Sequence, residues 1–255
     1  MKKQELINYI NEYLQIWEFN DSSKNWLQVD STKDEIKKIW YAVDATTYIF
    51  KKAKEENIDL ILAHHWLFWW FEQVLVWVPF KRTKFLLENN IALAWYHLPL
   101  DAHPEVGNNI WLLKAFVNTF NLEDYTKEEI IEYKGKTIWF GIKFEKEISL
   151  KEIQEKYLKQ ANLIDETYAF WKEKIKSVAF CSGWAGSEVK QVYDLWYDLY
   201  ITGEAVHHEK TFAKELAQSV IYAGHYETEK FWPKLLAEHL QEKFGLEIVF
   251  LDEKY

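Results

Sequence analysis

The strongest constraint on the fold of this chain is a unit that occurs twice in its sequence. An apolar, strand-like segment ends in histidine, and a carboxylate follows four residues later. The first copy, IALAWYHLPLD, contains His97 and Asp101, and the second, SVIYAGHYETE, contains His225 and Glu229. Because a helix-like segment precedes both copies, the pattern indicates an internal duplication of an α/β unit.

Strand-like and helix-like segments alternate along most of the chain, which favours an α/β fold with mixed, mainly parallel sheets. We expect strands at 37–46, 58–65, 91–97, 136–144, 176–186, 198–208, 219–225 and 246–251, and helices at 2–17, 46–57, 81–90, 108–120, 149–161, 187–196, 209–218 and 229–244. Asn108 or Asn109 is expected to cap the helix at 108–120. The charged, non-periodic stretch around residues 121–135 is interpreted as the crossing between two repeats, 1–124 and 125–255.

The histidines at the ends of the predicted strands form a candidate metal site. The segment DLILAHH ends in His64 and His65, and ligands in open α/β sheets bind beyond the carboxyl ends of strands. Imidazole nitrogen and carboxylate oxygen are ligands for divalent metals, and one tetrahedral ion needs fewer than are present. We therefore predict a two-metal centre with six candidate ligands: His64, His65, His97, Asp101, His225 and Glu229.

Other polar groups near strand ends are weaker candidates. His97 either binds metal or orients Asp101 without touching the ion. The segment TGEAVHH offers Glu204 and His208 as acid–base or substrate-binding residues, although a helix-start charge and a surface histidine are equally ordinary readings. Asp44 is expected to be a turn residue or a partner of a ligand, and Cys181 to be core packing.

Composition excludes several classes of protein. The formal net charge is −9 and Arg82 is the only arginine, so specific nucleic acid binding is not expected. Cys181 is the only cysteine, which rules out an intramolecular disulfide. With no apolar leader and no long apolar run, we expect a cytoplasmic protein without a membrane span.

The segments HHWLFW, YHLPLDAHPEVGNN, ITGEAVHH and AGHYETE resemble the Nif-three-like dinuclear metal-centre proteins, also called GTP cyclohydrolase I type 2 homologues. The resemblance runs essentially end to end, starting at EFNDSSKNWLQV and VDAT. It implies two intertwined α/β repeats with a metal site in the cleft between them, a cytoplasmic homohexamer, and two divalent ions per subunit. Carried over residue by residue, the family's ligands fall on His64, His65, Asp101, His225 and Glu229.

The resemblance and the ligand set together lead to a hypothesis about function. We expect a metal-dependent hydrolase of a nucleotide or a related phosphate-containing small molecule, with Glu204 or His208 near the departing group. The alternatives are a metal-binding or metal-delivery protein without turnover, and a ring-forming scaffold held by metal. The ligands are compatible with Zn, Fe, Mn, Co or Ni.

The sequence departs from the family mainly at tryptophans. It has 14 Trp and only 8 Gly, and Trp26, Trp66, Trp184 and Trp196 stand where the family has glycine or another small residue. Trp69, by contrast, fits an aromatic position of the family. The UGA codon is read as tryptophan in some bacterial lineages and as glycine in others. Our hypothesis is that many of these tryptophans are glycines in the native protein.

Overall fold

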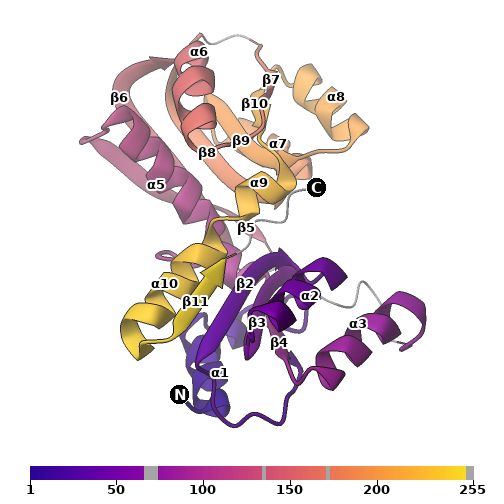
Figure 1. Cartoon of the computed structure of the whole chain (residues 1–255). Helices are drawn as coiled ribbons and strands as arrows, with labels where there is room; N and C mark the ends of the chain where they lie inside the picture. The colour runs from indigo at the N-terminus through magenta and orange to yellow at the C-terminus, as the bar shows by residue number, and fades with distance from the viewer. Residues whose placement is uncertain (66–73, 134–135, 171–172, 251–255) are drawn as a thin grey trace. The chain divides into compact units, whose positions relative to one another are not determined.

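The structure of the chain is a computed structural model, and it describes residues 1–65, 74–133, 136–170 and 173–250. The backbone forms two compact units. Unit 1 comprises Met1–Leu100 and Trp232–Tyr255, and unit 2 comprises Asp101–Phe231. Each unit is built around its own β-sheet (Figure 1).

Unit 1 contains a five-stranded sheet with the strand order β1-β4-β3-β2-β11. The pairs β4-β3, β3-β2 and β2-β11 are parallel. Among the described strands of this sheet, only β1 runs antiparallel to its neighbour. The residues of β4 and most of those of β2 and β3 are buried, as expected for parallel strands covered on both faces. The strands are β1 (Trp26–Val29), β2 (Lys38–Asp44), β3 (Leu60–His65), β4 (Ala92–Trp95) and β11 (Glu247–Phe250).

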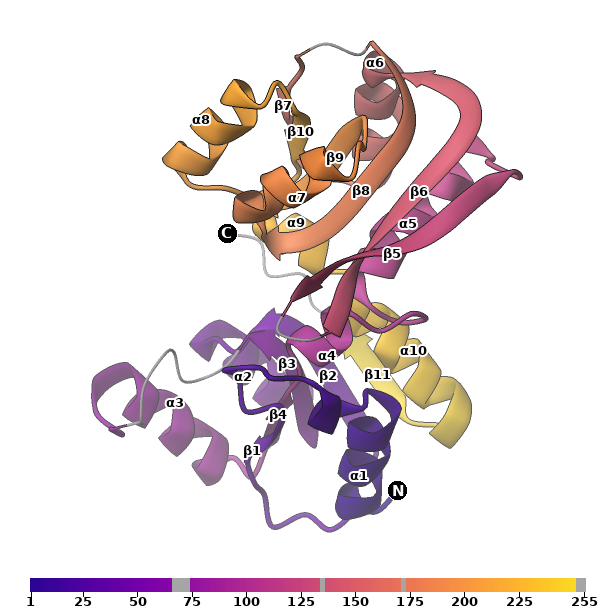
Figure 2. The same ribbon diagram turned by 180° about the vertical axis from the view of Figure 1, so that it is seen from behind.

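Helices cover both faces of this sheet. Helices α2 and α3 lie on one face, and α1 and α10 lie on the other (Figure 2). Helix α2 starts where the side chain of Thr46 accepts a hydrogen bond from the backbone of Ile49, and it buries Ile49 and Phe50. The helices are α1 (Lys3–Tyr13), the 3₁₀ turn η1 (Ile16–Glu18), α2 (Thr47–Glu55), α3 (Trp77–Glu88), α4 (Leu98–Asp101) and α10 (Trp232–Phe244).

Unit 2 contains a six-stranded sheet with the strand order β5-β6-β8-β9-β10-β7. Its centre, β8-β9-β10, is parallel, whereas β5, β6 and β7 make antiparallel pairs. Strands β6 and β8 are long and curve across the unit (Figure 2). The strands are β5 (Tyr125–Tyr133), β6 (Lys136–Ser149), β7 (Glu166–Tyr168), β8 (Lys174–Trp184), β9 (Leu199–Glu204) and β10 (Ser219–Tyr222).

The core of unit 2 lies between this sheet and the helices α5 and α6–η2. Phe116 of α5 and Tyr157 of η2 pack against Phe180 of β8 and Ile142 of β6. Helices α7 and α8 lie on the other face of the sheet (Figures 1 and 2). The helices are α5 (Asn108–Phe120), α6 (Leu150–Glu152), the π-helical η2 (Ile153–Leu158), the 3₁₀ turn η3 (Gly186–Glu188), α7 (Val189–Asp194), α8 (His207–Glu215) and α9 (His225–Glu229).

The predicted α/β fold with mixed sheets is confirmed, but the predicted N-cap of α5 is wrong. The charged stretch at 121–135 contains a strand that the sequence did not predict, because Tyr125–Tyr133 forms β5 and pairs with β6. Neither Asn108 nor Asn109 caps α5, whose N-cap is Gly107. The repeat boundary after residue 124 falls inside unit 2, and β11 adds to the sheet of unit 1.

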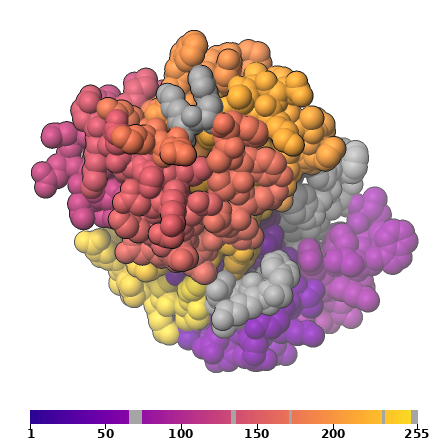
Figure 3. All heavy atoms as spheres, turned by 90° about the horizontal axis from the view of Figure 1, so that it is seen from above, coloured from indigo at the N-terminus to yellow at the C-terminus, as the bar shows by residue number. Residues whose placement is uncertain are grey.

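Helices α3 and α8 are both visible at the surface in the space-filling view (Figure 3). Within the described ranges, no helix combines the length and the apolar character that crossing a bilayer requires.

Candidate metal centre

Unit 1 gathers three histidines at the carboxyl end of its sheet. His64 and His65 end β3, and His97 lies two residues beyond the neighbouring parallel strand β4. Their ring centroids are 5.0 Å apart for His64 and His65, and 5.1 Å apart for His64 and His97. His64 is fully buried, whereas His65 and His97 are partly exposed. The parallel register of β3 and β4 therefore groups these imidazoles as the sequence predicts.

Each of these imidazoles has an oxygen next to Nδ1. His64 Nδ1 lies 3.0 Å from the carbonyl oxygen of Tyr96, and His65 Nδ1 lies 2.8 Å from Oδ1 of Asp44. A carbonyl or carboxylate oxygen only accepts, so Nδ1 donates and the lone pair of a neutral ring is on Nε2. This arrangement is typical of histidines that bind a metal through Nε2. Asp44, the last residue of β2, thus orients His65.

Asp21 has the same relation to His97, and the sequence did not single it out. Its Oδ2 lies 3.1 Å from Nδ1 of His97 and accepts a hydrogen bond from the backbone of Leu98 at 3.1 Å, while its Oδ1 accepts one from the backbone of Ser23 at 3.0 Å. Burial alone would raise the pKa of Asp21. Hydrogen bonding and charge from His97, with bonds from Ser23 and Asn25, instead lower it to about 2.

The loop that contains Asp21 is also fixed to the end of β4 through its backbone. Asn25 Oδ1 accepts a hydrogen bond from the backbone nitrogen of His97 at 2.6 Å, and Asn25 Nδ2 donates to Asp21 Oδ2 at 3.1 Å. The available sequence signal was the series Asp21, Ser23 and Asn25, because Asp and Asn side chains favour such local backbone bonds.

Unit 2 holds Asp101 in a buried polar network. Oδ1 of Asp101 accepts hydrogen bonds from Asn108 Nδ2 at 2.8 Å and from Ser182 Oγ at 3.1 Å. Asn109 in turn accepts from the backbone of Ser182 at 2.7 Å and donates to the carbonyl of Ile138 at 2.7 Å. The two asparagines that were predicted as caps therefore anchor Asp101 to α5, β6 and β8.

Helix α9 carries the second candidate pair of unit 2. Nε2 of His225 lies 3.1 Å from Oε2 of Glu229, and Nδ1 of His225 lies 2.7 Å from Oε1 of Glu204 at the end of β9. Glu229 is buried, with 4% of its surface exposed. Glu204 therefore accepts from Nδ1 of His225 in the same way that Asp44 accepts from Nδ1 of His65.

Glycine at position 183 lets the backbone of β8 approach Glu229. A Cβ atom on Gly183 would clash with Oε1 of Glu229, and Gly183 has a φ of +65°. The backbone nitrogen of Gly183 donates to Thr228 Oγ1 at 3.0 Å. This close packing fixes α9 against the end of β8.

Several predicted residues lie outside these clusters. His208 is in the exposed first turn of α8 and, among the described residues, makes no side-chain hydrogen bond. Burial raises the pKa of the Cys181 thiol, in agreement with a packing role. Trp66, Trp69 and the aromatic segment at 66–71 lie outside the described residues.

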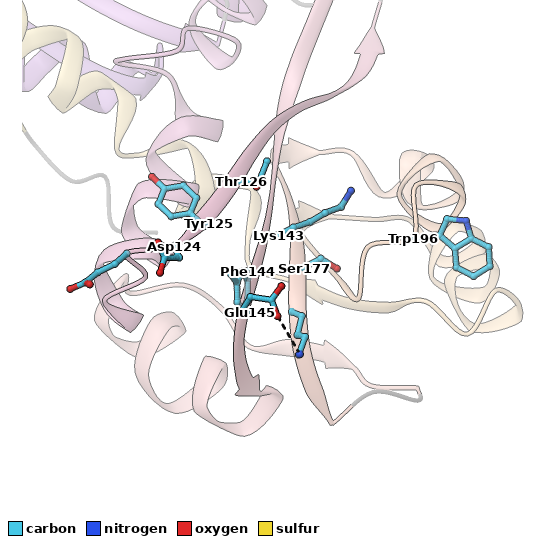
Figure 4. A pocket seen from close by; sticks show the side chains of 10 residues that line it. Asp124, Tyr125, Thr126, Lys143, Phe144, Glu145, Ser177 and Trp196 are labelled. Carbon is cyan, nitrogen blue, oxygen red and sulfur yellow. Dashed lines mark ion pairs between the residues drawn. The ribbon is translucent and has the colours of Figure 1, made fainter.

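A separate groove of about 630 Å³ lies on unit 2, beside β5, β6 and β8 (Figure 4). Lys143, Lys176, Glu145 and Trp196 are among its lining residues, and none of the candidate ligands is.

The described residues thus include buried or partly buried His, Asp and Glu side chains that could hold a metal ion. They are His64, His65 and His97 in unit 1, and Asp101 and Glu229 in unit 2. The donor set of imidazoles and carboxylates fits a first-row divalent ion.

Comparison with known proteins gives one consistent result. The family model described as Duf34/NIF3 (NGG1p interacting factor 3) matches residues 1–255. A curated relative from Archaeoglobus fulgidus, named GTP cyclohydrolase 1 type 2 homolog, is 38% identical and covers 99% of this chain and 98% of its own. The crystal structure of TTHA1606 from Thermus thermophilus is 34% identical, with a TM-score of 0.84 over 100% of this chain and 99% of that one. The solved structure of protein ybgI is 29% identical, with a TM-score of 0.89 over the same shares of the two chains.

Proposed function

The chain belongs to the Duf34/NIF3 family, and we propose that it holds two divalent metal ions and hydrolyses a nucleotide or a related phosphate-containing small molecule. The observation that carries the proposal is the set of Nδ1 contacts. His64, His65, His97 and His225 each have an oxygen acceptor next to Nδ1, which leaves the same nitrogen, Nε2, to act as the ligand.

Two of the candidate ligands, Asp101 and Glu229, lie in unit 2 near the points where the chain passes between the units. The chain passes from one unit to the other after Leu100 and after Phe231. Asp101 follows His97 by four residues, and Glu229 precedes the second crossing by two residues. Each of these two candidate ligands of unit 2 therefore lies within a few residues of one crossing. The curated relative from Archaeoglobus fulgidus matches this chain over nearly its full length, which supports the proposal that the two proteins share one fold and one ligand set.

In the proposed reaction the residues of the chain have separate tasks. Two divalent ions at these ligands would acidify a water molecule and withdraw charge from a phosphoryl oxygen. Asp21, Asp44 and Glu204 keep His97, His65 and His225 oriented and their Nδ1 atoms protonated. Asn108 and Ser182 hold Asp101 in one orientation. Glu204 is proposed here as a positioning residue, and His208 remains a candidate for contact with the departing group.

Metal content and turnover test the proposal. Purified protein is loaded separately with Zn, Mn, Fe, Co and Ni, and its metal content is measured by elemental analysis. We expect about two ions per chain, and loss of metal in His65→Ala. His239→Gln is the matched control, because His239 lies on α10 and bonds Tyr9 Oη at 2.6 Å. A wild-type protein that binds no metal would refute the metal centre.

The same loaded protein is assayed for phosphate or pyrophosphate release from a panel of nucleotides and phosphoesters. Turnover that depends on His65 and Asp101 supports the hydrolase. Tight metal binding without turnover, together with transfer of metal to an apo-acceptor, would instead support metal delivery.

The assembly proposed with this function is a homohexamer, with a small-molecule substrate as the other partner. Exposed apolar side chains such as Val74, Leu75 and Val78, just before and within the first turn of α3, are compatible with subunit contacts. Sedimentation velocity measures the mass in solution, and a purely monomeric protein would rule the hexamer out.

A further inference from the structure

Trp196 has a backbone conformation that favours glycine. It follows α7 and its C-cap Leu195, and its φ is +62°. The backbone nitrogens of Trp196 and Tyr197 donate to the carbonyls of Tyr193 and Val192 at 3.0 and 3.4 Å, which closes the helix in the manner of a left-handed C-terminal cap. A bulky residue in this region of φ is an outlier, because its Cβ crowds the backbone.

Other helices of the chain end in the same way with residues suited to it. Asparagine or glycine takes the left-handed position after or at the end of five helices, at Asn57, Asn90, Asn121, Asn162 and Gly245. Gln15 and Ala217 are positive-φ residues after α1 and α8. None of these seven residues has an aromatic side chain. An isoleucine or leucine follows each of the asparagines and Gly245, and the buried Tyr197 follows Trp196.

Burial of the indole does not compensate for this conformation. Trp196 is 76% exposed, and its ring stacks on the neighbouring Tyr193 with 6.3 Å between centroids. Figure 4 shows the indole at the side of the groove on unit 2, apart from Lys143 and Ser177. A tryptophan selected for packing would bury much of its large apolar surface.

Trp77 has the same two properties in unit 1. Its φ is +49° and it is 81% exposed, at the first residue of α3. Trp77 is not among the positions that the family resemblance singled out, so the backbone identifies it independently. The chain as a whole has 14 Trp and 8 Gly. This is an excess of tryptophan and a deficit of glycine, as expected if tryptophan stands at positions that are glycine in the native protein.

We infer that the native protein carries glycine at positions 77 and 196, because the codons there are translated as glycine in the organism that makes it. Glycine adopts positive φ without a Cβ clash, so both backbone conformations become ordinary. The exchange also removes two exposed indoles from the surface, one at the start of α3 and one at the groove of unit 2.

Peptide mass spectrometry of the protein isolated from its native host tests the inference directly. Trypsin releases Gln191–Lys210, which contains position 196, and fragment spectra of Glu55–Lys81 report position 77. We expect glycine residue masses at both positions. Tryptophan masses there would overturn the inference, whatever the protein binds or catalyses.

Recombinant variants give a second test that needs no native material. Trp77→Gly and Trp196→Gly are each expected to raise the thermal midpoint of the protein. The matched control is Phe212→Gly, since Phe212 is 42% exposed but lies inside α8, where glycine weakens a helix and should lower the midpoint. At either position, a Trp→Gly midpoint that falls as it does for Phe212→Gly would count against glycine there.

Discussion

The carboxylate of Asp21 lies 3.1 Å from Nδ1 of His97, although 76 residues separate the two in sequence. Asp21 accepts further hydrogen bonds from the backbone nitrogen of Ser23, in its own loop, and from that of Leu98, next to His97. One buried carboxylate thus fixes both the loop before β1 and the imidazole beyond β4. Carboxylates at Asp44 and Glu204 repeat the relation with His65 and His225.

Removal of the Asp21 carboxylate should destabilise unit 1. Asp21→Ala leaves the partly buried donors of Ser23, Asn25 and Leu98 without their acceptor. We expect the free energy of unfolding in the metal-free protein to fall by about 3 kcal/mol. Asp30→Ala is the control, because Asp30 pairs with Lys3 at an exposed position and should change stability by about 1 kcal/mol or less. Urea unfolding measures both. Equal losses in the two variants would show that Asp21 has no special structural role.

Substitution of Glu204 separates a positioning role from acid–base catalysis. Glu204→Ala removes the acceptor of His225 Nδ1, and we expect metal affinity to fall roughly 10–100-fold. Glu204→Gln keeps an acceptor oxygen and should recover part of that affinity. Isothermal titration with Zn or Co measures the change. If both variants bind metal like the wild type but lose turnover alike, Glu204 is instead an acid–base group.

Gly183→Ala should lower the free energy of unfolding by more than the positive φ of Gly183 alone explains. Gly245→Ala provides the control, because Gly245 has a similar φ of +67° but nothing within 4 Å of an added Cβ. We expect about 1–2 kcal/mol of destabilisation at Gly245 from positive φ. At Gly183 the contact with Glu229 should add about 1–3 kcal/mol. Chemical denaturation compares the two, and indistinguishable losses would argue against tight packing around Glu229.

Acid titration should reveal the capping box of α6. Hydrogen bonds from Lys156 and then from Ser149 lower the pKa of Glu152 from 4.5 to about 2. Because the folded-state pKa is depressed, the stability that Glu152 contributes is present above its unfolded pKa and is lost as the pH falls toward 2. The thermal midpoint of Glu152→Gln should therefore lie below that of the wild type near neutral pH and converge with it near pH 2. A gap that is constant over this range would contradict the assignment.

The strands that sequence could not predict share one property. β1, β5 and β7 all lie at the edges of their sheets. The central strands β2, β3, β4, β8, β9 and β10 are apolar because helices cover both faces, and their sequences show it. In β5, YTKEEIIEY, solvent contact allows charged residues, so the segment reads as a linker.

The sequence predicts the candidate ligands better than it predicts the groups that hold them. Histidines that end apolar runs, such as His64 and His97, are predictable because parallel strands end at one edge of a sheet. The partners Asp21, Asn108 and Ser182 reach their positions through tertiary contacts from segments without hydrophobic periodicity. A single sequence carries little signal for such contacts.

The pairing of β11 with β2 has a consequence for biosynthesis. A ribosome completes residues 101–231, the whole of unit 2, before α10 and the edge strand β11 of unit 1 have emerged. Nascent domains usually fold in the order in which they are made, but here the domain begun first is finished last. The sheet whose strands β3 and β4 end at the imidazoles is therefore completed only after the whole of unit 2 has been synthesised.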